Sequence, residues 1–364
     1  MISIGSTRSW GTAGLLLSLS LIGCQGVSNV PPVAHDVSVA AGPCEKVGHA
    51  ALCEQLVQRR TYTTAVGWTP AQLQDAYNLP SSARGKGDVV GVVDAYDNPN
   101  AAADLAEYRS YFNLPSANFD KFNQDGERTD YPPANSGWGI DIDQDIEMVS
   151  ASCPNCTVYL IEANSDGWGD IEAAESEAVK LGADIVSNSY GGSGADQSYY
   201  NAKGVEYLGA GGEGYTQPAD FDSVVAVGGT VLTKGGGGKR GWTETAWSGA
   251  GGGCIEEVPK PSWQRRGPHC NYRQANDVAA VADGVAIYDS YKYGGWFAAG
   301  GTAVSTPFLA GVFGLAGNAN KQDGGRTFWL PKHQKHLYEV QNNERYLRYS
   351  AAAGFGTPDG INAF

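Results

Sequence analysis

Two aspartates four positions apart, Asp141 and Asp145, have the spacing best suited to proton-transfer chemistry in this sequence. They lie in segment 141–152, which we predict to be a helix, and an i, i+4 spacing brings their Cβ atoms within about 5 to 6 Å. Neighbouring carboxylates repel, so one of them is expected to hold its proton more tightly than an ordinary aspartate. The alternative is a solvated acidic face near a helix N-terminus, because Asp143 and Glu147 lie on the same segment.

The cysteines indicate a disulfide protein. The chain has seven, and setting Cys24 aside leaves three local pairs: Cys44 with Cys53, Cys153 with Cys156, and Cys254 with Cys270. Paired cysteines in an exported chain are most simply disulfides. CysProAsnCys (153–156) is also compatible with a redox or zinc motif. A tetrahedral zinc site usually needs four ligands, and no second Cys pair or His pair at ligand spacing accompanies this one.

The N-terminus indicates export. Arg8 precedes an apolar run over 13–22, which is too short to span a bilayer as a helix and is typical of a signal peptide. LeuIleGlyCys (21–24) is similar to a bacterial lipobox, in which the cysteine becomes lipidated; the alternative is an ordinary cleaved signal. Membrane contact is expected only through a lipid anchor at Cys24. The expected organisation is an export signal with lipobox over 1–24, a tether with a short disulfide segment over 25–61, and one domain over 62–364.

Composition excludes one class of partner. The 364 residues carry a formal net charge of −14 and include 50 glycines, and the sequence pI is about 4.7. Nucleic-acid binding is driven largely by clusters of Lys and Arg, and the sequence has none, so we expect no nucleic-acid partner.

Strands and helices alternate from about residue 62 onward. The run ValValGlyValValAsp (89–94) is typical of a strand buried on both faces of a parallel sheet. Four glycines at 235–238 predict a hairpin loop. This alternation predicts an α/β fold with an open, mostly parallel central sheet and helices on both faces. The expected helices cover 69–77, 101–112, 141–152, 170–181 and 304–317, and the expected strands cover 89–94, 157–162, 183–190, 205–210 and 223–227.

The order of these segments resembles the subtilisin-like fold and, within it, the sedolisin family of serine-carboxyl peptidases. The resemblance spans 67–364 and implies a three-layer fold and peptide-bond hydrolysis under acid conditions. It rests on GWTPAQLQDAYNLP (67–80), VVGVVDAYDNPNAAADL (89–105), GWGIDIDQDIEMVSASCPNC (137–156), DIVSNSYGG (184–192), VVAVGGT (224–230), TETAWSGAGGGC (243–254), KPSWQ (260–264) and GGTAVSTPFLAG (300–311).

The resemblance implies a carboxylate base. Sedolisins carry a Glu and, four residues later, an Asp on the central helix where subtilisins carry histidine, which suits acid conditions. None of the five histidines lies there: they are at 35, 49, 269, 333 and 336. Asp145 matches the family Asp. Asp141 replaces the Glu and is one methylene shorter, by about 1 Å of reach, where catalytic geometry tolerates little misplacement.

The other two catalytic positions depart from the family. Gly212 stands where an Asp would help stabilise the oxyanion, and losing one such donor typically costs about 10² to 10³ in turnover. Ala303 stands where the serine nucleophile is expected, a loss of about 10⁶ in a related enzyme. The candidate substitutes are Glu213, whose side chain should point away from that of residue 212, and Ser305, about 200° around the helix axis from Ala303. An ordinary first-turn helix serine is the alternative for Ser305.

The family resemblance also implies calcium near the C-terminus. Glu339 stands where an acidic ligand is expected, but the later loop is shortened around 351–358. Calcium favours six or more oxygens, and the tail does not supply them. No other cofactor is indicated.

We therefore predict an exported, lipid-anchored or secreted sedolisin-like homologue whose proteolytic chemistry is impaired or absent, with a peptide or protein as its ligand. Two alternatives remain open. One is an active acid endopeptidase of the serine type. The other is a non-catalytic surface lipoprotein with a peptide-binding or structural role.

Overall fold

The computed structural model describes residues 52–53, 56–57, 61–212, 216–236, 238–264, 270–340 and 348–364. The chain divides into two units, 1–32 and 33–364, and the described residues all belong to the second. The predictions for the export signal, Cys24, the Cys44–Cys53 pair and Glu213 lie outside what is described. None of the described helices is long and apolar enough to cross a membrane.

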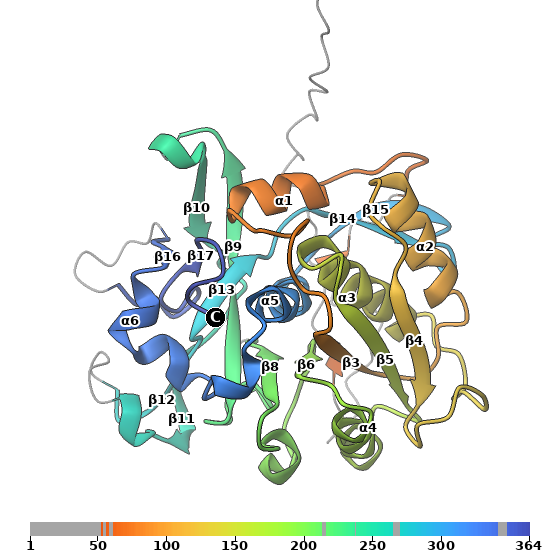
Figure 1. The fold of residues 1–364 in the computed structure, drawn as a ribbon. Coiled ribbons are helices and arrows are strands. Elements are labelled where there is room, and N and C mark those ends of the chain that lie inside the picture. Colours follow the sequence, from red (N-terminus) through yellow and green to blue (C-terminus); the bar gives the residue numbers. More distant parts are fainter. Residues whose placement is uncertain are drawn as a thin grey trace, which may run out of the picture. The chain divides into compact units, whose positions relative to one another are not determined.

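The centre of the fold is an eight-stranded sheet in the order β10-β9-β8-β6-β3-β5-β4, with β13 also paired to β9 (Figure 1). Every pairing in it is parallel except that of β10 with β9. The mostly parallel sheet expected from the sequence is confirmed. Its strands are β3 (Val89–Ala95), β4 (Asn118–Asn123), β5 (Thr157–Ala163), β6 (Ile185–Asn188), β8 (Glu206–Ala210), β9 (Val224–Lys234), β10 (Trp242–Ala246) and β13 (Val278–Val281).

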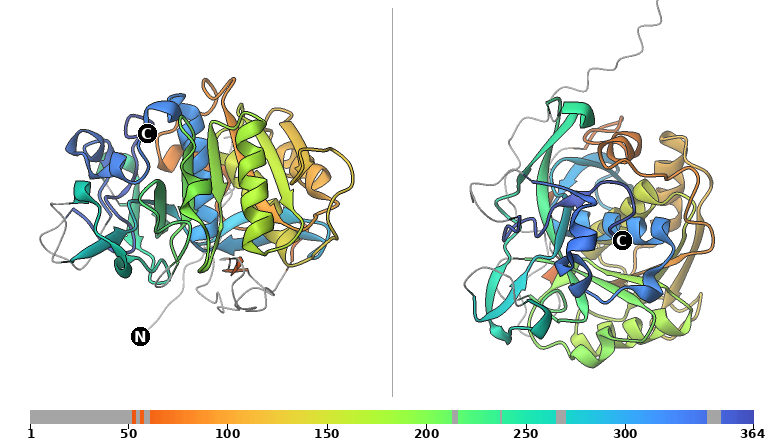
Figure 2. Two further views of the ribbon diagram at one scale, coloured as in Figure 1. Left: turned by 90° about the horizontal axis from the view of Figure 1, so that it is seen from below. Right: turned by 60° about the vertical axis from the view of Figure 1, so that its left-hand side comes forward.

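Helices cover both faces of this sheet, in three layers (Figures 1 and 2). Alternate strand residues belong to different cores: Val92 packs with the helices of one face, and Val93 packs with α4 on the other. The first face carries α1 (Pro70–Ala76), α2 (Ala101–Tyr111), α3 (Trp138–Ser152) and α5 (Thr302–Ala316), and the second carries α4 (Trp168–Lys180).

Smaller sheets complete the fold. A three-stranded antiparallel sheet in the order β14-β15-β2 leads into α5, so its turn and α5 are positioned together. Its strands are β14 (Val285–Asp289), β15 (Gly295–Gly300) and β2 (Leu56–Val57). The remaining pairs are β1 (Leu52–Cys53) with β7 (Tyr190–Gly191), β11 (Gly253–Pro259) with β12 (Tyr272–Ala275), and β16 (Leu337–Tyr338) with β17 (Thr357–Pro358); a short α6 covers Pro331–Gln334.

Local signals set the helix ends. Thr69 and Gln72 form a capping box at the start of α1, with Pro70 in the first turn, as the sequence suggested. Helix α3 starts at Trp138, three residues earlier than expected, because the Asn135 side chain accepts the N–H groups of Gly137 (2.8 Å) and Trp138 (3.2 Å). Asp141 therefore lies within the first turn of α3 rather than at its start.

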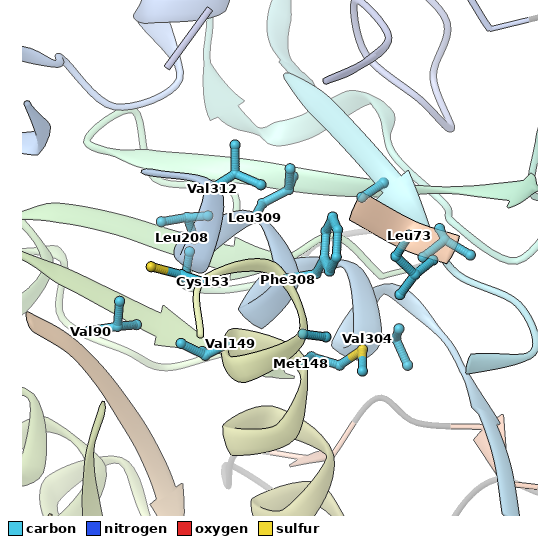
Figure 3. Close-up of a cluster of buried hydrophobic side chains, with 14 of the residues drawn as sticks. Leu73, Val90, Met148, Val149, Cys153, Leu208, Val304, Phe308, Leu309 and Val312 are labelled. Atoms are coloured by element: carbon cyan, nitrogen blue, oxygen red, sulfur yellow. The ribbon is translucent and has the colours of Figure 1, made fainter. Parts of the chain in front are cut away.

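Helices α3 and α5 pack closely and run in the same direction (Figure 3). A Cβ atom on Gly311 would lie 2.0 Å from Ser152 Oγ and 2.9 Å from the Val149 carbonyl oxygen, so only glycine permits this contact. Asp141 precedes Val149 by eight positions, and Ala303 precedes Gly311 by eight, a rise of about 12 Å along each helix. The contact therefore places both residues towards the same end of the helix pair.

Two of the three predicted disulfides are confirmed. Cys153 is bonded to Cys156 directly after α3, and Cys254 is bonded to Cys270 beside the β11–β12 pair. The CysProAsnCys segment thus closes the connection from α3 to β5.

Candidate functional site

Three buried carboxyl groups lie together where the parallel strands end, and we call Asp94, Asp141 and Asp145 the strand-end acids. Asp94 is near the end of β3, and the other two come from α3. Burial, followed by the charges of Asp145 and Asp141, raises the pKa of Asp94 well above its usual range. The three groups therefore lie within electrostatic reach of one another, and at least one of them favours the protonated form.

Of the two acids on α3, Asp145 has the larger effect on Asp94. Burial raises the pKa of its carboxyl group well above the usual range, and the side chains of Ser189 and Gln144 lie against it and oppose part of that rise. Ser189 directly follows β6, which pairs with β3 in the sheet. A buried carboxyl group that holds its proton beyond acid pH can donate or accept a proton where an ordinary aspartate is already ionised.

The interpretation of α3 as a solvated acidic helix is wrong. Its four acids are at most 1% exposed. The pair Asp141 and Asp145 belongs with Asp94, whereas Asp143 and Glu147 are influenced by acids of α2 and β14. Helix α3 is enclosed on both acidic faces because it lies between the sheet and these other elements, an arrangement that its own charge pattern does not reveal.

Ala303, predicted to stand at the nucleophile position, carries only a methyl group. Ala303 is fully buried in the first turn of α5. Ser305, two residues later, donates its hydroxyl to the carbonyl oxygens of Ala280 (3.1 Å) and Val281 (2.8 Å) on β13. That hydroxyl fastens α5 to the sheet and does not face the strand-end acids in these contacts.

Gly212, predicted to stand at the oxyanion position, lies two residues after the end of β8. Gly212 is buried, and its carbonyl oxygen accepts the N–H of Gly252 at 3.2 Å. Its neighbour Gly211 has no room for a side chain, because a Cβ atom there would lie 1.8 Å from Asn276 Oδ1. The segment therefore passes close to a neighbouring loop without presenting a side chain of its own at these two positions.

Comparison with known proteins gives the family. Residues 134–356 match the profile of the subtilase family, Peptidase S8, over more than half of the chain. The chain belongs to the subtilase family.

Sedolisin is among the subtilase relatives found by both sequence and structure. Sedolisin from Pseudomonas sp. (strain 101) is 21% identical over 338 residues, 78% of this chain and 55% of that protein. This chain thus spans about half the length of the curated relative it matches. The structure of Pseudomonas sedolisin, a serine-carboxyl proteinase complexed with two molecules of pseudo-iodotyrostatin, superposes with a TM-score of 0.68 at 22% identity, covering 81% of this chain and 96% of that one.

A second solved structure, sphericase, gives a TM-score of 0.53 at 18% identity and covers 82% of this chain and 99% of that chain. These matches confirm the sedolisin resemblance and the subtilisin-like fold.

Within the subtilase fold, sequence reasoning missed two acids at the strand ends. Asp94 closes the apolar run 89–94, and Glu162 is its register partner on β5. Burial raises the pKa of Glu162 to about 9, while Lys121, with its ammonium 3.4 Å from Glu162 Oε1, lowers it. The available signal was an acidic residue at the carboxyl end of each buried strand, where α/β folds place their functional groups.

Glu339 lies elsewhere in the subtilase fold. It is exposed and lines a cavity of about 630 Å³ together with Asp75, Arg240 and Tyr338. Among the described residues, the acidic group spaced to hold a metal ion does not include Glu339. Calcium binding at the C-terminal tail stays a prediction, since residues 341–347 beside Glu339 lie outside the described chain.

Proposed function

We propose that this subtilase is an exported sedolisin-like homologue that does not perform serine-type peptide hydrolysis and instead binds peptide segments near the strand ends. The observation that carries the proposal is Ala303 at the start of α5. A methyl group cannot attack a carbonyl carbon, and removing the nucleophile of a related enzyme lowers turnover by about 10⁶. Export is supported by the two disulfides.

The nearby hydroxyl does not replace the missing nucleophile. Ser305 already donates to two carbonyl oxygens of β13, and a nucleophile must instead lie within hydrogen-bond reach of its base. Gly212 removes a second catalytic group, because no side chain is present there to stabilise an oxyanion. Peptide binding needs neither group, so the same surface can hold a peptide without cleaving it.

An active acid endopeptidase is the second candidate, and a specific observation favours it. The strand-end acids are intact and buried, and the pKa of Asp145 is raised, as expected of a carboxyl group that works in acid. This candidate needs a nucleophile other than residue 303.

Incubation of the purified protein with a denatured protein substrate at about pH 3 to 5 tests the proposal. We expect no cleavage. We also expect the protein to bind fluorescently labelled peptides from a digest of that substrate, which an increase in fluorescence polarisation would show. Cleavage that is lost in Asp145→Ala would establish the acid endopeptidase instead. Cleavage that survives Asp145→Ala would point to a contaminant or to a mechanism unrelated to sedolisins. If the protein neither cleaves the substrate nor binds the peptides, a structural role remains and the binding proposal is overturned.

A further inference from the structure

A second group of acids lies on the other acidic face of α3, and we call Asp104, Asp143, Glu147 and Asp289 the turn acids. Asp104 comes from α2, Asp143 and Glu147 come from α3, and Asp289 ends β14. All four side chains are buried, at 0 to 2% exposure. Carboxylate oxygens of Asp104, Asp143 and Asp289 lie within 4.8 Å of one another. Three distant segments of the chain thus bring acidic groups to one buried point.

Backbone amides of β14 and of the turn that follows it orient three of these carboxylates. Ser290 N donates to Asp104 Oδ2 at 2.9 Å, Tyr288 N donates to Glu147 Oε2 at 3.0 Å, and Lys292 N donates to Asp289 Oδ1 at 2.8 Å. Each of these bonds uses one oxygen of its carboxylate. Carboxylates that bind metals are commonly oriented by hydrogen bonds to one of their oxygens, and the other oxygen then coordinates the metal.

Several other oxygens of the turn acids are buried and receive no hydrogen bond from an N–H group or a hydroxyl. No N–H group or hydroxyl donates to Glu147 Oε1 or Asp289 Oδ2, and the Tyr108 hydroxyl on α2 has no partner, while the carboxyl group of Asp143 is within hydrogen-bond reach only of the carboxyl groups of Asp104 and Asp289. Buried polar atoms in native proteins nearly always have a partner. These atoms point to a ligand that the protein chain itself does not supply.

No basic side chain compensates the turn acids. Within the described residues, none of the four forms an ion pair with Lys, Arg or His. Arg109 on α2 is committed to the carbonyl oxygens of Pro115 and Pro154 and to Ser150 Oγ. An isolated ionised carboxylate is very costly to bury. The cluster must therefore keep several protons or hold a cation.

We propose that the turn acids form a binding site for a divalent cation, and that this cation is calcium. Calcium takes six to eight oxygen ligands at about 2.3 to 2.6 Å, so two oxygens bound to one ion lie at most about 5 Å apart. The spacing of the Asp104, Asp143 and Asp289 carboxylates, all within 4.8 Å of one another, fits this limit. These three carboxylates, with the Glu147 carboxylate close enough to interact with Asp104 and Asp289, offer oxygen ligands only. Such a set suits calcium better than zinc, and Mg²⁺ prefers a smaller octahedral site that retains several waters.

The cation would act as a structural link. It would join α2, α3 and the β14–β15 turn, and β15 leads directly into α5. Because α3 also carries two strand-end acids, a cation held by Asp143 and Glu147 fixes the helix that positions Asp141 and Asp145. The site is separate from the C-terminal tail that contains Glu339.

The test measures thermal unfolding of the full chain after treatment with EGTA and dialysis, at near-neutral pH, with CaCl₂ or MgCl₂ added back. We expect the unfolding midpoint to rise with calcium concentration, by about 5 °C at a hundredfold excess over Kd, and to rise less with magnesium. Isothermal titration should give binding at this site with the same affinity. No calcium-dependent shift in the wild-type chain would overturn the proposal.

Variants locate the site. Asp143→Asn is expected to weaken calcium binding at least a hundredfold and, in EGTA, to unfold no earlier than the wild type, because it removes a buried charge. Glu147→Gln should weaken binding in the same direction and serves if Asp143→Asn fails to fold. The matched control is Asp141→Asn, the same change on the other acidic face of α3, which should retain the calcium response. A calcium response that persists in both Asp143→Asn and Glu147→Gln would overturn the assignment. A calcium response that is lost in Glu339→Gln would show that the ion binds at the C-terminal tail instead.

Discussion

The two acidic faces of α3 differ in what surrounds their carboxyl groups. On the strand-end face, no backbone amide donates to Asp94 or Asp145, and only the side chains of Ser189 and Gln144 lie against Asp145. On the turn face, backbone amides hold one oxygen each of Asp104, Glu147 and Asp289. Carboxyl groups without backbone donors can change protonation more readily, whereas carboxylates held by backbone amides are oriented as ligands.

Helix α3 thus contributes side chains to two different kinds of site. Asp141 and Asp145 are one i, i+4 pair, and Asp143 and Glu147 are another, displaced by two positions and therefore by about 200° around the axis. The two pairs point to opposite sides of α3, and the fold buries both sides.

The largest expected effect concerns the strand-end face. The combined change Ala303→Ser, Gly212→Asp and Asp141→Glu should raise acid proteolysis of a denatured substrate by about 10³-fold or more, because it restores a nucleophile and an oxyanion donor. Adding Asp145→Ala should abolish the gain. Adding Glu107→Gln, an exposed acid of α2, should leave it intact. A restored variant that stays silent would mean that these positions do not converge.

A buried acid outside both acidic faces of α3 shows how burial alone affects a single carboxyl group. Glu175 on α4 accepts a hydrogen bond from the Tyr190 hydroxyl at 3.0 Å, and burial raises the pKa of Glu175 to about 8. Because the folded-state pKa lies above the unfolded value of about 4.3, its contribution to stability is complete below about pH 4 and is lost as the pH rises towards about 8.

Glu175→Gln should therefore flatten the dependence of stability on pH in this window by an amount on the order of a few kcal/mol. Urea unfolding at about pH 4.5, 6 and 8 measures the free energy of unfolding for wild type and variant. Parallel pH profiles for the two proteins would contradict the role given to this carboxyl group.

A change in the packing of α5 against α3 should affect the strand-end face of α3 and leave its turn face unchanged. Gly311→Ala places a Cβ atom against Ser152 Oγ and the Val149 carbonyl, and should lower the free energy of unfolding by about 1 to 3 kcal/mol. It should also reduce the proteolysis of the restored variant, since α5 carries residue 303. The calcium response of the turn acids, which do not contact α5 through Gly311, should persist.

The matched control for that change is Gly169→Ala on α4, where a Cβ atom meets nothing within 4 Å. Alanine is favoured over glycine in a helix, so this variant should be unchanged or slightly more stable. Equal losses of stability in both variants, measured by urea unfolding, would show that close packing at Gly311 is not the cause of the loss.

The smallest expected effect concerns Ser305. Ser305→Ala removes a hydroxyl that donates to two carbonyl oxygens of β13 and should cost about 1 kcal/mol of stability. In the restored variant it should leave the rate of proteolysis unchanged. Ser110→Ala, an exposed serine of α2, should affect neither stability nor proteolysis. A loss of proteolysis in Ser305→Ala would give this hydroxyl a part in the chemistry.

Much of the fold could be predicted from local pattern. The apolar run 89–94 predicted β3, the segment 69–77 was expected to be helical and forms α1, and the glycines at 235–238 predicted the β9–β10 hairpin, because each signal is local in the sequence. The catalytic positions were predicted from the family resemblance, which orders whole segments, and they stay predictions. Glu162 was missed because its partner Asp94 is 68 residues away in the sequence and adjacent only in the sheet.

By itself, the sequence determined the spacing of the acids on α3, the alanine at position 303 and the order of strands and helices, since these depend on residue type and local periodicity. Only the tertiary structure decided that neither acidic face of α3 meets solvent. Burial depends on which distant segments pack there, and Asp289 and the amides of its turn come from more than 130 residues further along the chain. The same packing set the role of the Ser305 hydroxyl, because its partners lie on β13 and not in its own helix.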